Sequence, residues 1–415
     1  MAYVNFEQVL NGKYPAKSHA QRTAQTDHSI LFIPPIVDAD VIWAGLPTTT
    51  EEALEKYDVD EVRHTTQVAD TLAELAGTNP GSTVYTIESQ SSGNTPLSMF
   101  QEHDAQSIKL ILEKCRVVKD EYEIAMIRKA NYITCRGIEA VMARAKTAET
   151  EAELEAAFRE RCISHHSKET TYPPIVAAGA GAATLHYVDN QQPLKGKLNL
   201  LIDAGCEWNN YASDITRTFP LTGKFTEESR KIYDLVHKMT VDTTNELRAG
   251  VVFEDLHILT HKIAIDGLLE LGILQGDRDE IFAARTSTAF FPVGLGHHLG
   301  LDCHDTGGGQ NRQDPDKLFP NLRLRGTVPA GSVVTIEPGI YFCEFLIKPF
   351  LLDPAHSKFF NQAVLDKYWT VGGIRQVFLS IQENILENNV LVTETGTENF
   401  TTIPMDADSV EALCK

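Results

Sequence analysis

The sequence predicts an α+β protein with two domains, and three observations lead to that prediction. The length of 415 residues exceeds the roughly 150 residues of a typical domain. Short runs of β-branched and aromatic residues alternate with segments of helical spacing. The composition also changes near residues 115–120, after which longer helical segments begin. We therefore place the domain boundary there.

The first part of the chain is predicted to mix short strands and helices. Runs such as LFIPPI and STVYTI are rich in β-branched and aromatic residues and are bounded by Pro, Gly or Asn, which is typical of strands. The intervening segments have helical composition. We expect strands over residues 31–36, 40–47 and 82–87, and helices over residues 50–57 and 68–76.

The second part is predicted to contain longer helices and buried strands. In residues 119–145, apolar side chains recur at helical spacing and acids occupy the first turns. The run KLNLLID is typical of a buried strand. We expect helices over residues 119–145, 149–164, 227–247 and 255–271, and strands over residues 197–203, 332–342 and 390–392.

The composition excludes several classes of protein. With 37 Lys+Arg against 57 Asp+Glu, the formal charge is −20, so the surface would repel nucleic acid and anionic lipid. No signal or transit peptide is visible at the start, and no apolar run is long enough to span a membrane. The seven cysteines are widely spaced without a CxxC pair, which favours reduced thiols and a cytoplasmic location.

The stretch LLIDAGCEWNNYASDITRTFP holds the first candidate metal ligands. Asp203 closes an apolar strand-like run, and Asp214 begins a second one. Two antiparallel strands joined by residues 207–210 would bring both carboxylates to one place. Acids are common in this chain, so a surface hairpin without a ligand remains the alternative for this pair alone.

A cluster of histidines and glycines supplies the second candidate. The segment GLGHHLGLDCHD contains His297, His298 and His304 beside three glycines, which allow the backbone to approach a ligand closely. A turn with solvated imidazoles is the alternative, and this segment by itself does not decide between them.

Two glutamates at strand ends complete the set. Glu337 ends a run that is otherwise typical of a buried strand, where an unpaired carboxylate would be costly. Glu387 precedes the apolar strand at residues 390–392. Four carboxylates and one imidazole favour hard divalent ions such as Mn²⁺, Mg²⁺ or Co²⁺, and two such ions can activate one water for hydrolysis. His186 and His304 would be available to move protons or to bind the tetrahedral intermediate.

Six motifs in a fixed order carry a family resemblance: LHY, LIDAG, SDITRTFP, GLGHHLGLDCHD, IEPGIY and a Glu before an LVT strand. This order resembles the pita-bread metallopeptidases (the creatinase/aminopeptidase fold), in their aminopeptidase P and prolidase branch, and most closely the fungal-type Xaa-Pro aminopeptidases. The resemblance implies an N-terminal aminopeptidase P-type domain over residues 1–116, shortened relative to the family. A pita-bread catalytic domain would span residues 117–405, and a tail residues 406–415.

The resemblance also implies a site and a reaction. Two Mn²⁺ ions would be bound by Asp203, Asp214, His297, Glu337 and Glu387, of which Asp214 and Glu387 would bridge the ions. His186 would contact the leaving side of the substrate, His304 would support the tetrahedral intermediate, and Tyr341 would lie close to the ligands. The enzyme would remove the N-terminal residue before a penultimate proline, or alternatively split Xaa-Pro dipeptides. Its partners would be proline-containing peptides and, in a homo-oligomer, further copies of the chain, but neither nucleic acid nor membrane.

Two departures from the family pattern concern the site. Val293 occupies a position where the family has a histidine. Arg375 is separated from Glu387 by residues 376–386, which form an apparent insertion. As a result, Ile385 stands in the position where the family has an arginine. Glu383 is an alternative to Glu387 as the metal ligand. A catalytically impaired pita-bread module that binds peptides or proteins therefore stays an alternative to the enzyme.

Overall fold

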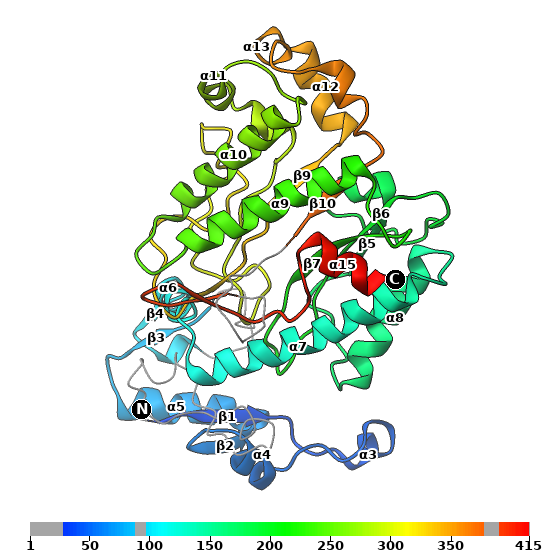
Figure 1. Ribbon diagram of the computed structural model, residues 1–415. Helices are drawn as coiled ribbons and strands as arrows, with labels where there is room; N and C mark the ends of the chain where they lie inside the picture. The colour runs from blue at the N-terminus through cyan, green and yellow to red at the C-terminus, as the bar shows by residue number, and fades with distance from the viewer. Residues whose placement is uncertain (1–27, 88–96, 377–389, 415) are drawn as a thin grey trace. The chain divides into compact units, whose positions relative to one another are not determined.

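The computed structural model in Figure 1 describes residues 28–87, 97–376 and 390–414. The chain divides into two compact units. The first consists of Met1–Arg116 with Asp120–Tyr122, and the second of Val117–Lys119 with Glu123–Lys415. None of the described helices is both long enough and apolar enough to cross a membrane.

In its described residues, the N-terminal unit contains two short parallel strand pairs and four α-helices. β1 (Ile30–Ile33) pairs with β2 (Glu61–His64), and β3 (Thr83–Tyr85) pairs with β4 (Glu102–Asp104). The predicted strands near residues 31–36 and 82–87 are confirmed, and so are the two predicted helices. The helices are α3 (Asp38–Ala44), α4 (Thr50–Lys56), α5 (Val68–Thr78) and α6 (Ser107–Cys115).

The prediction of a strand over residues 40–47 is wrong, because this segment lies largely in helix α3. Its apolar and β-branched residues are typical of a strand, yet Ile42 and Trp43 are 82% and 86% exposed. The signals for helix ends outweigh β-propensity here. Two aspartates stand in the first turn, and Gly45 ends the helix with a φ of 79°.

Four long helices of the second unit confirm the predicted ones to within about two residues. They are α7 (Glu121–Arg144), α8 (Glu151–Ser164), α9 (Glu227–Glu246) and α10 (Phe253–Glu270). The apolar stripe of α7 faces inward, since Ile127, Ile133 and Ile138 are fully buried. In Figure 1, α9 lies on one side of the strands β5 to β7, and α7 with α8 lies on the other. The main core joins side chains of these helices and strands.

A three-stranded antiparallel sheet forms the centre of this unit: β5 (Ile175–Ala178), β6 (Asn199–Ala204) and β7 (Ile215–Pro220). Every residue of the three strands is buried. β6 and β7 form the predicted hairpin, with Asp203 opposite Thr216. At its tip Asn209 and Asn210 have φ values of 49° and 67°, as a two-residue type I′ turn requires. This hairpin fixes the two aspartates relative to each other.

The predicted strand over residues 332–342 is two short strands. β8 (Val333–Val334) pairs with β11 (Val390–Val392), which also pairs with β12 (Thr397–Asn399). β9 (Gly339–Tyr341) pairs with β10 (Gly373–Arg375). Pro338, which has no N–H to donate, stands between β8 and β9.

The remaining helices are shorter. The last of them, α15, covers most of the expected tail, and Val410 packs into the main core. They are α11 (Arg278–Ala283), α12 (Glu344–Leu352), α13 (Pro354–Ser357), α14 (Gln362–Leu365) and α15 (Ala407–Cys414).

Candidate metal centre and substrate cavity

Two aspartates on the central hairpin form what we call the acidic side of the site. Asp203 and Asp214 are 5% and 4% exposed. The hydroxyl of Tyr172 lies 2.6 Å from Oδ1 of Asp203 and 2.8 Å from Oδ1 of Asp214. Gly205 allows the hairpin to close this tightly, because a Cβ there would lie 1.8 Å from the carbonyl oxygen of Ser213. The two carboxylates therefore face one point in the fold.

A loop over residues 293–305, with Glu337 beside it, forms the loop side of the site. The loop runs antiparallel to residues 333–337. The N–H of Thr335 donates to the carbonyl of His297 (2.9 Å), and the N–H of Glu337 donates to that of Leu295 (2.7 Å). A Cβ at Gly296 would lie 1.9 Å from the carbonyl oxygen of Thr335, so glycine permits the close approach. His297 and Glu337 are brought together in this way.

The imidazole of His297 links the two sides. Its Nδ1–H donates to the carbonyl of His298 over 2.9 Å, which leaves the lone pair on Nε2. Nε2 is buried without a hydrogen bond, 3.3 Å from Oδ2 of Asp214 and 3.2 Å from Oε1 of Glu337. A lone pair facing two carboxylates is unfavourable unless a cation or a proton lies between them. The donor set therefore fits a bound divalent cation.

Arg375 supplies the positive charge nearest to the carboxylates. Its Nη1 donates to Oδ2 of Asp203 over 2.6 Å, and its Nη2 contacts Oε2 of Glu337. Burial works to lower the pKa of Arg375, but the charges of Asp203 and Asp214 outweigh burial and raise it. The guanidinium thus stays charged and joins the acidic side to Glu337.

The two aspartates differ in proton affinity. Burial raises the pKa of Asp203, against the opposing effect of Arg375. Burial also acts to raise the pKa of Asp214, but the charge of Arg375 and the hydrogen bond from Tyr172 act against burial, and the net effect is to lower it. Burial and the neighbouring carboxylates raise the pKa of Tyr172 well above its ordinary value. Tyr172 is therefore a hydroxyl donor at neutral pH, and Asp214 is ionised.

A cavity of about 580 Å³ opens beside these groups. Its polar wall includes Asp203, Asp214, Glu337 and Arg375, and its apolar wall includes Pro173, Ile175, Leu185 and Val188. His186, which precedes β6 in the sequence, and His304, in the loop over residues 293–305, also line the cavity. Both residues are exposed to solvent. The cavity is large enough for a short peptide segment.

The structure brings most of the predicted site residues together. Asp203, Asp214, His297, Glu337 and Arg375 form one cluster, and His186, His304 and Val293 line the adjoining cavity. Tyr341 is buried in β9, where burial and then the charge of Asp203 raise the pKa of its phenol. Glu387, Glu383, Ile385 and residues 377–386 of the apparent insertion lie outside the described residues.

Sequence reasoning missed three groups that shape the site. Tyr172 precedes two prolines in TTYPP, and nothing local marks it as a partner of the aspartates. The sequence marks Cys303 only as one of seven reduced thiols, yet its Sγ–H donates to Oδ2 of Asp214 over 3.3 Å. Lys119 and Asp305, each 1% exposed in the side chain, form an ion pair of 2.9 Å. The contact of Cys303 with Asp214 and the ion pair of Lys119 with Asp305 each join residues far apart in sequence, so no local pattern reveals them.

A buried cluster of carboxylates around one imidazole, set at the wall of a peptide-sized cavity, is typical of a metallopeptidase. Comparison with known proteins agrees. Residues 125–394 match metallopeptidase family M24, and residues 16–85 match the aminopeptidase P N-terminal domain. The chain belongs to metallopeptidase family M24.

Two similar proteins are probable Xaa-Pro aminopeptidases of fungi. One, from Metarhizium acridum (strain CQMa 102), is 52% identical and covers 100% of this chain and 92% of the relative. Another, from Fusarium vanettenii, is 56% identical with coverages of 100% and 99%. Both alignments span 469 positions against the 415 residues here, so at least 54 aligned positions of each relative lack a counterpart in this chain.

The fold is shared with a solved bacterial enzyme. The low-pH form of aminopeptidase P from E. coli superposes with a TM-score of 0.76 at 29% identity, covering 94% of this chain and 83% of that one. The predicted resemblance to the aminopeptidase P branch and the predicted α+β pita-bread fold are thereby confirmed.

Proposed function

We propose that this chain is a metal-dependent exopeptidase that removes the N-terminal residue of peptides whose second residue is proline. The observation that carries this proposal is the position of His297. Its Nε2 is buried without a hydrogen bond and points between Asp214 and Glu337, at the edge of the cavity. The similar fungal Xaa-Pro aminopeptidases support the choice of substrate.

The metal would be bound by Asp203, Asp214, His297, Glu337 and Glu387, and we propose two Mn²⁺ ions in this set. Hard divalent ions suit a set of four carboxylates and one imidazole. Such ions supply an activated water and polarise the scissile carbonyl. Asp214 and Glu387, which carry the bridging roles in the family pattern, would connect the two ions.

The chain's own groups orient this site. Tyr172 donates its hydroxyl hydrogen between Asp203 and Asp214, which restrains both carboxylates. Arg375 holds Asp203 and Glu337 from the other side. Partners that orient ligands in this way influence both metal affinity and activity.

The cavity wall suits a peptide with proline in second place. Burial lowers the pKa of His304, so its imidazole is neutral at pH 7 and can form a hydrogen bond with the reacting carbonyl. His186 would face the leaving proline nitrogen. The apolar side chains of Ile175, Leu185 and Val188 offer a surface against which a pyrrolidine ring can pack.

Substrate discrimination tests the proposal. The Mn²⁺-loaded protein is incubated with Xaa-Pro-Yaa and Xaa-Ala-Yaa peptides and with an Xaa-Pro dipeptide, and the released N-terminal residue is quantified. We expect release from Xaa-Pro-Yaa and at least tenfold less from the alanine peptide. Release from the dipeptide alone would indicate the prolidase alternative, and peptide binding without release would indicate the impaired binding module.

A further inference from the structure

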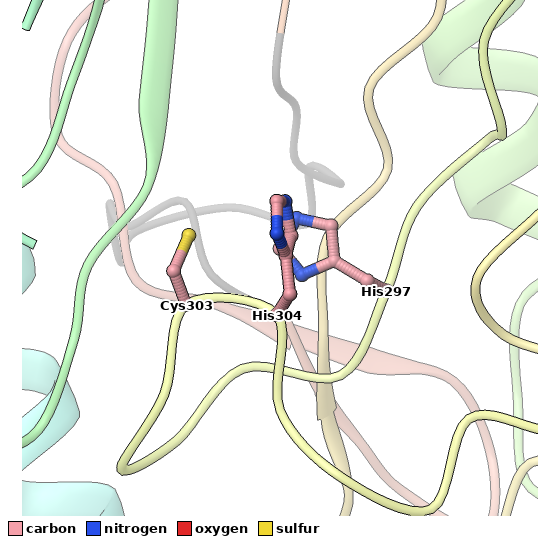
Figure 2. A group of neighbouring side chains, drawn as sticks. All are labelled: His297, Cys303 and His304. Atoms are coloured by element: carbon pink, nitrogen blue, oxygen red, sulfur yellow. The ribbon is translucent and has the colours of Figure 1, made fainter. Parts of the chain in front are cut away.

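The two histidines that line the cavity are positioned by different means. His304 lies edge to face against His297, with ring centroids 4.5 Å apart, as Figure 2 shows. The exposed imidazole of His186 has no such neighbour, because among the residues that the structure describes it forms no hydrogen bond, ion pair or ring contact. The position of His186 therefore depends on the backbone of residues 184–192, which we call the cavity loop.

Tyr187, the next residue along the cavity loop, is held at both its ring and its hydroxyl. The hydroxyl donates to Oε2 of Glu151 over 2.7 Å. The ring packs against a small apolar cluster of Ile175, Ala177, Ala182 and Leu201. Leu185, His186 and Val188, on either side of Tyr187 in the chain, all line the cavity. An anchored residue among three cavity-lining residues restrains where their side chains lie.

Glu151 accepts three hydrogen bonds at the start of α8. Its side chain is fully buried. Oε1 accepts from the N–H of Ala178 over 2.7 Å, and Oε2 accepts from the N–H of Gln192 over 2.9 Å as well as from Tyr187. In the described part of the chain, no lysine or arginine forms an ion pair with it. A buried carboxylate without a counter-ion is costly unless hydrogen bonds compensate, so these three donors are needed. Glu151 thereby joins the end of β5 to both Tyr187 and the end of the cavity loop.

Asn190 ties the cavity loop to β5 a second time. Its φ of 50° lies in the left-handed region, which asparagine tolerates better than most residues. Its Oδ1 accepts from the N–H of Val176 over 2.9 Å, and its Nδ2 donates to the carbonyl of Pro174 over 2.7 Å. Nδ2 also donates to Oε2 of Glu155 in α8 over 2.8 Å. The loop after His186 is thus fixed to the sheet and to the helix.

We infer that Glu151 and Tyr187 are positioning residues for His186. Through them the buried start of α8 sets where the imidazole of His186 stands in the cavity, and so its distance from the leaving nitrogen. A misplacement of ~1 Å can cost about 100-fold in rate, so the anchor matters although it acts only through its neighbour. The link to catalysis rests on the proposed function, whereas the anchoring of the loop does not.

A double-mutant cycle tests the link between Tyr187 and His186. For an Xaa-Pro-Yaa peptide, kcat/KM is measured in the Mn²⁺-loaded wild type, Tyr187→Phe, His186→Ala and the double variant. We expect Tyr187→Phe to lower kcat/KM about 5- to 20-fold when His186 is present, because one hydrogen bond to a buried carboxylate is lost. In the His186→Ala background the loss should be less than ~2-fold. An equal loss in both backgrounds, or no loss in the first, would overturn the inference.

Tyr233→Phe is the matched control. Tyr233 is a buried tyrosine of α9, and its hydroxyl donates to the carbonyl of Met405 over 2.9 Å. The substitution removes a comparable hydrogen bond at a place that does not line the cavity, so a general loss of stability would appear here too. We expect kcat/KM to stay within ~2-fold of the wild-type value. A loss as large as that of Tyr187→Phe would mean that the effect is one of stability alone, which contradicts positioning.

Hydrogen exchange of the cavity loop tests the anchor without any activity. The exchange rates of residues 184–192 are compared by mass spectrometry in the wild type, Glu151→Gln, Tyr187→Phe and Tyr233→Phe. Glu151→Gln replaces one acceptor with a donor that faces other donors. We expect exchange to accelerate at least ~10-fold in Glu151→Gln and Tyr187→Phe and to keep the wild-type rate in Tyr233→Phe. Unchanged exchange in Tyr187→Phe would overturn the inference. If the wild type lacks peptidase activity, the proposed function fails, while exchange still decides whether the anchor holds the loop.

Discussion

The two sides of the site are built by different means. The acidic side is part of a buried antiparallel hairpin, in which Asp203 belongs to the paired strand β6 and Asp214 directly precedes β7. The loop side has no strand across residues 293–305, and it depends on glycine contacts and on the buried pair of Lys119 and Asp305. The difference indicates that the hairpin is fixed by the core, whereas His297 and His304 are fixed by a few specific contacts.

The largest effect is expected from removing a ligand on the acidic side. Asp214→Asn should lower kcat/KM by more than ~100-fold, because it replaces a charged ligand, while the strand pairing preserves the fold. The assays are peptide hydrolysis, metal content and circular dichroism. Asp189→Asn, at an exposed carboxylate, is the control. Full activity in Asp214→Asn would show that the metal assignment is wrong.

Breaking the ion pair should affect the stability of the loop side. Lys119→Met leaves Asp305 buried without its cation, and we expect a loss of about 3–5 kcal/mol in the free energy of unfolding. Lys348→Met removes an exposed pair with Glu344 and should cost less than ~1 kcal/mol. Urea unfolding measures both. Equal losses in the two variants would mean that the buried pair does not hold the loop.

Tyr172→Phe removes only the hydroxyl that touches both aspartates. The acidic side keeps its strands, so stability should change little, but the carboxylates lose an orienting donor. We expect metal affinity or kcat/KM to fall by about 10–100-fold. Metal titration followed by kinetics distinguishes the two effects. Wild-type values for both would exclude an orienting role.

Mild acid should weaken the loop side through His298. Burial, and next the charge of Lys119, lower the pKa of His298 to about 4. The unfolded chain therefore binds a proton near pH 6.5 that the folded chain rejects, so this stability is complete above pH 6.5 and is lost as the pH falls toward 4. Between pH 6.5 and 5 the loss is about 2 kcal/mol. The free energy of unfolding, measured at several pH values, should fall less steeply with decreasing pH in His298→Gln than in the wild type. The same pH dependence in both proteins would contradict the assignment to His298.

The same comparison explains what the sequence could predict. The acidic side has local signals: apolar strand runs, a two-residue Asn-Asn turn, and one carboxylate at the end of each run. For the loop side, the only local signal was a cluster of histidines and glycines. Only the family resemblance indicated that these histidines belong to the same metal site as the two aspartates. Tyr172 and the Lys119–Asp305 pair were missed because their partners lie 31 to 186 residues away along the chain. In α3, β-propensity misled because helix-end signals outweighed it.

Metal-dependent peptide cleavage tests the central proposal most directly. The protein is stripped of metal, Mn²⁺ is added back, and both bound manganese and the N-terminal residue released from an Xaa-Pro-Yaa peptide are measured. We expect the stripped protein to release no N-terminal residue. Release should recover as manganese is added back, up to a stoichiometry of about two bound ions per chain. Failure to bind manganese together with absence of release would contradict the assignment of this site as a metallopeptidase centre.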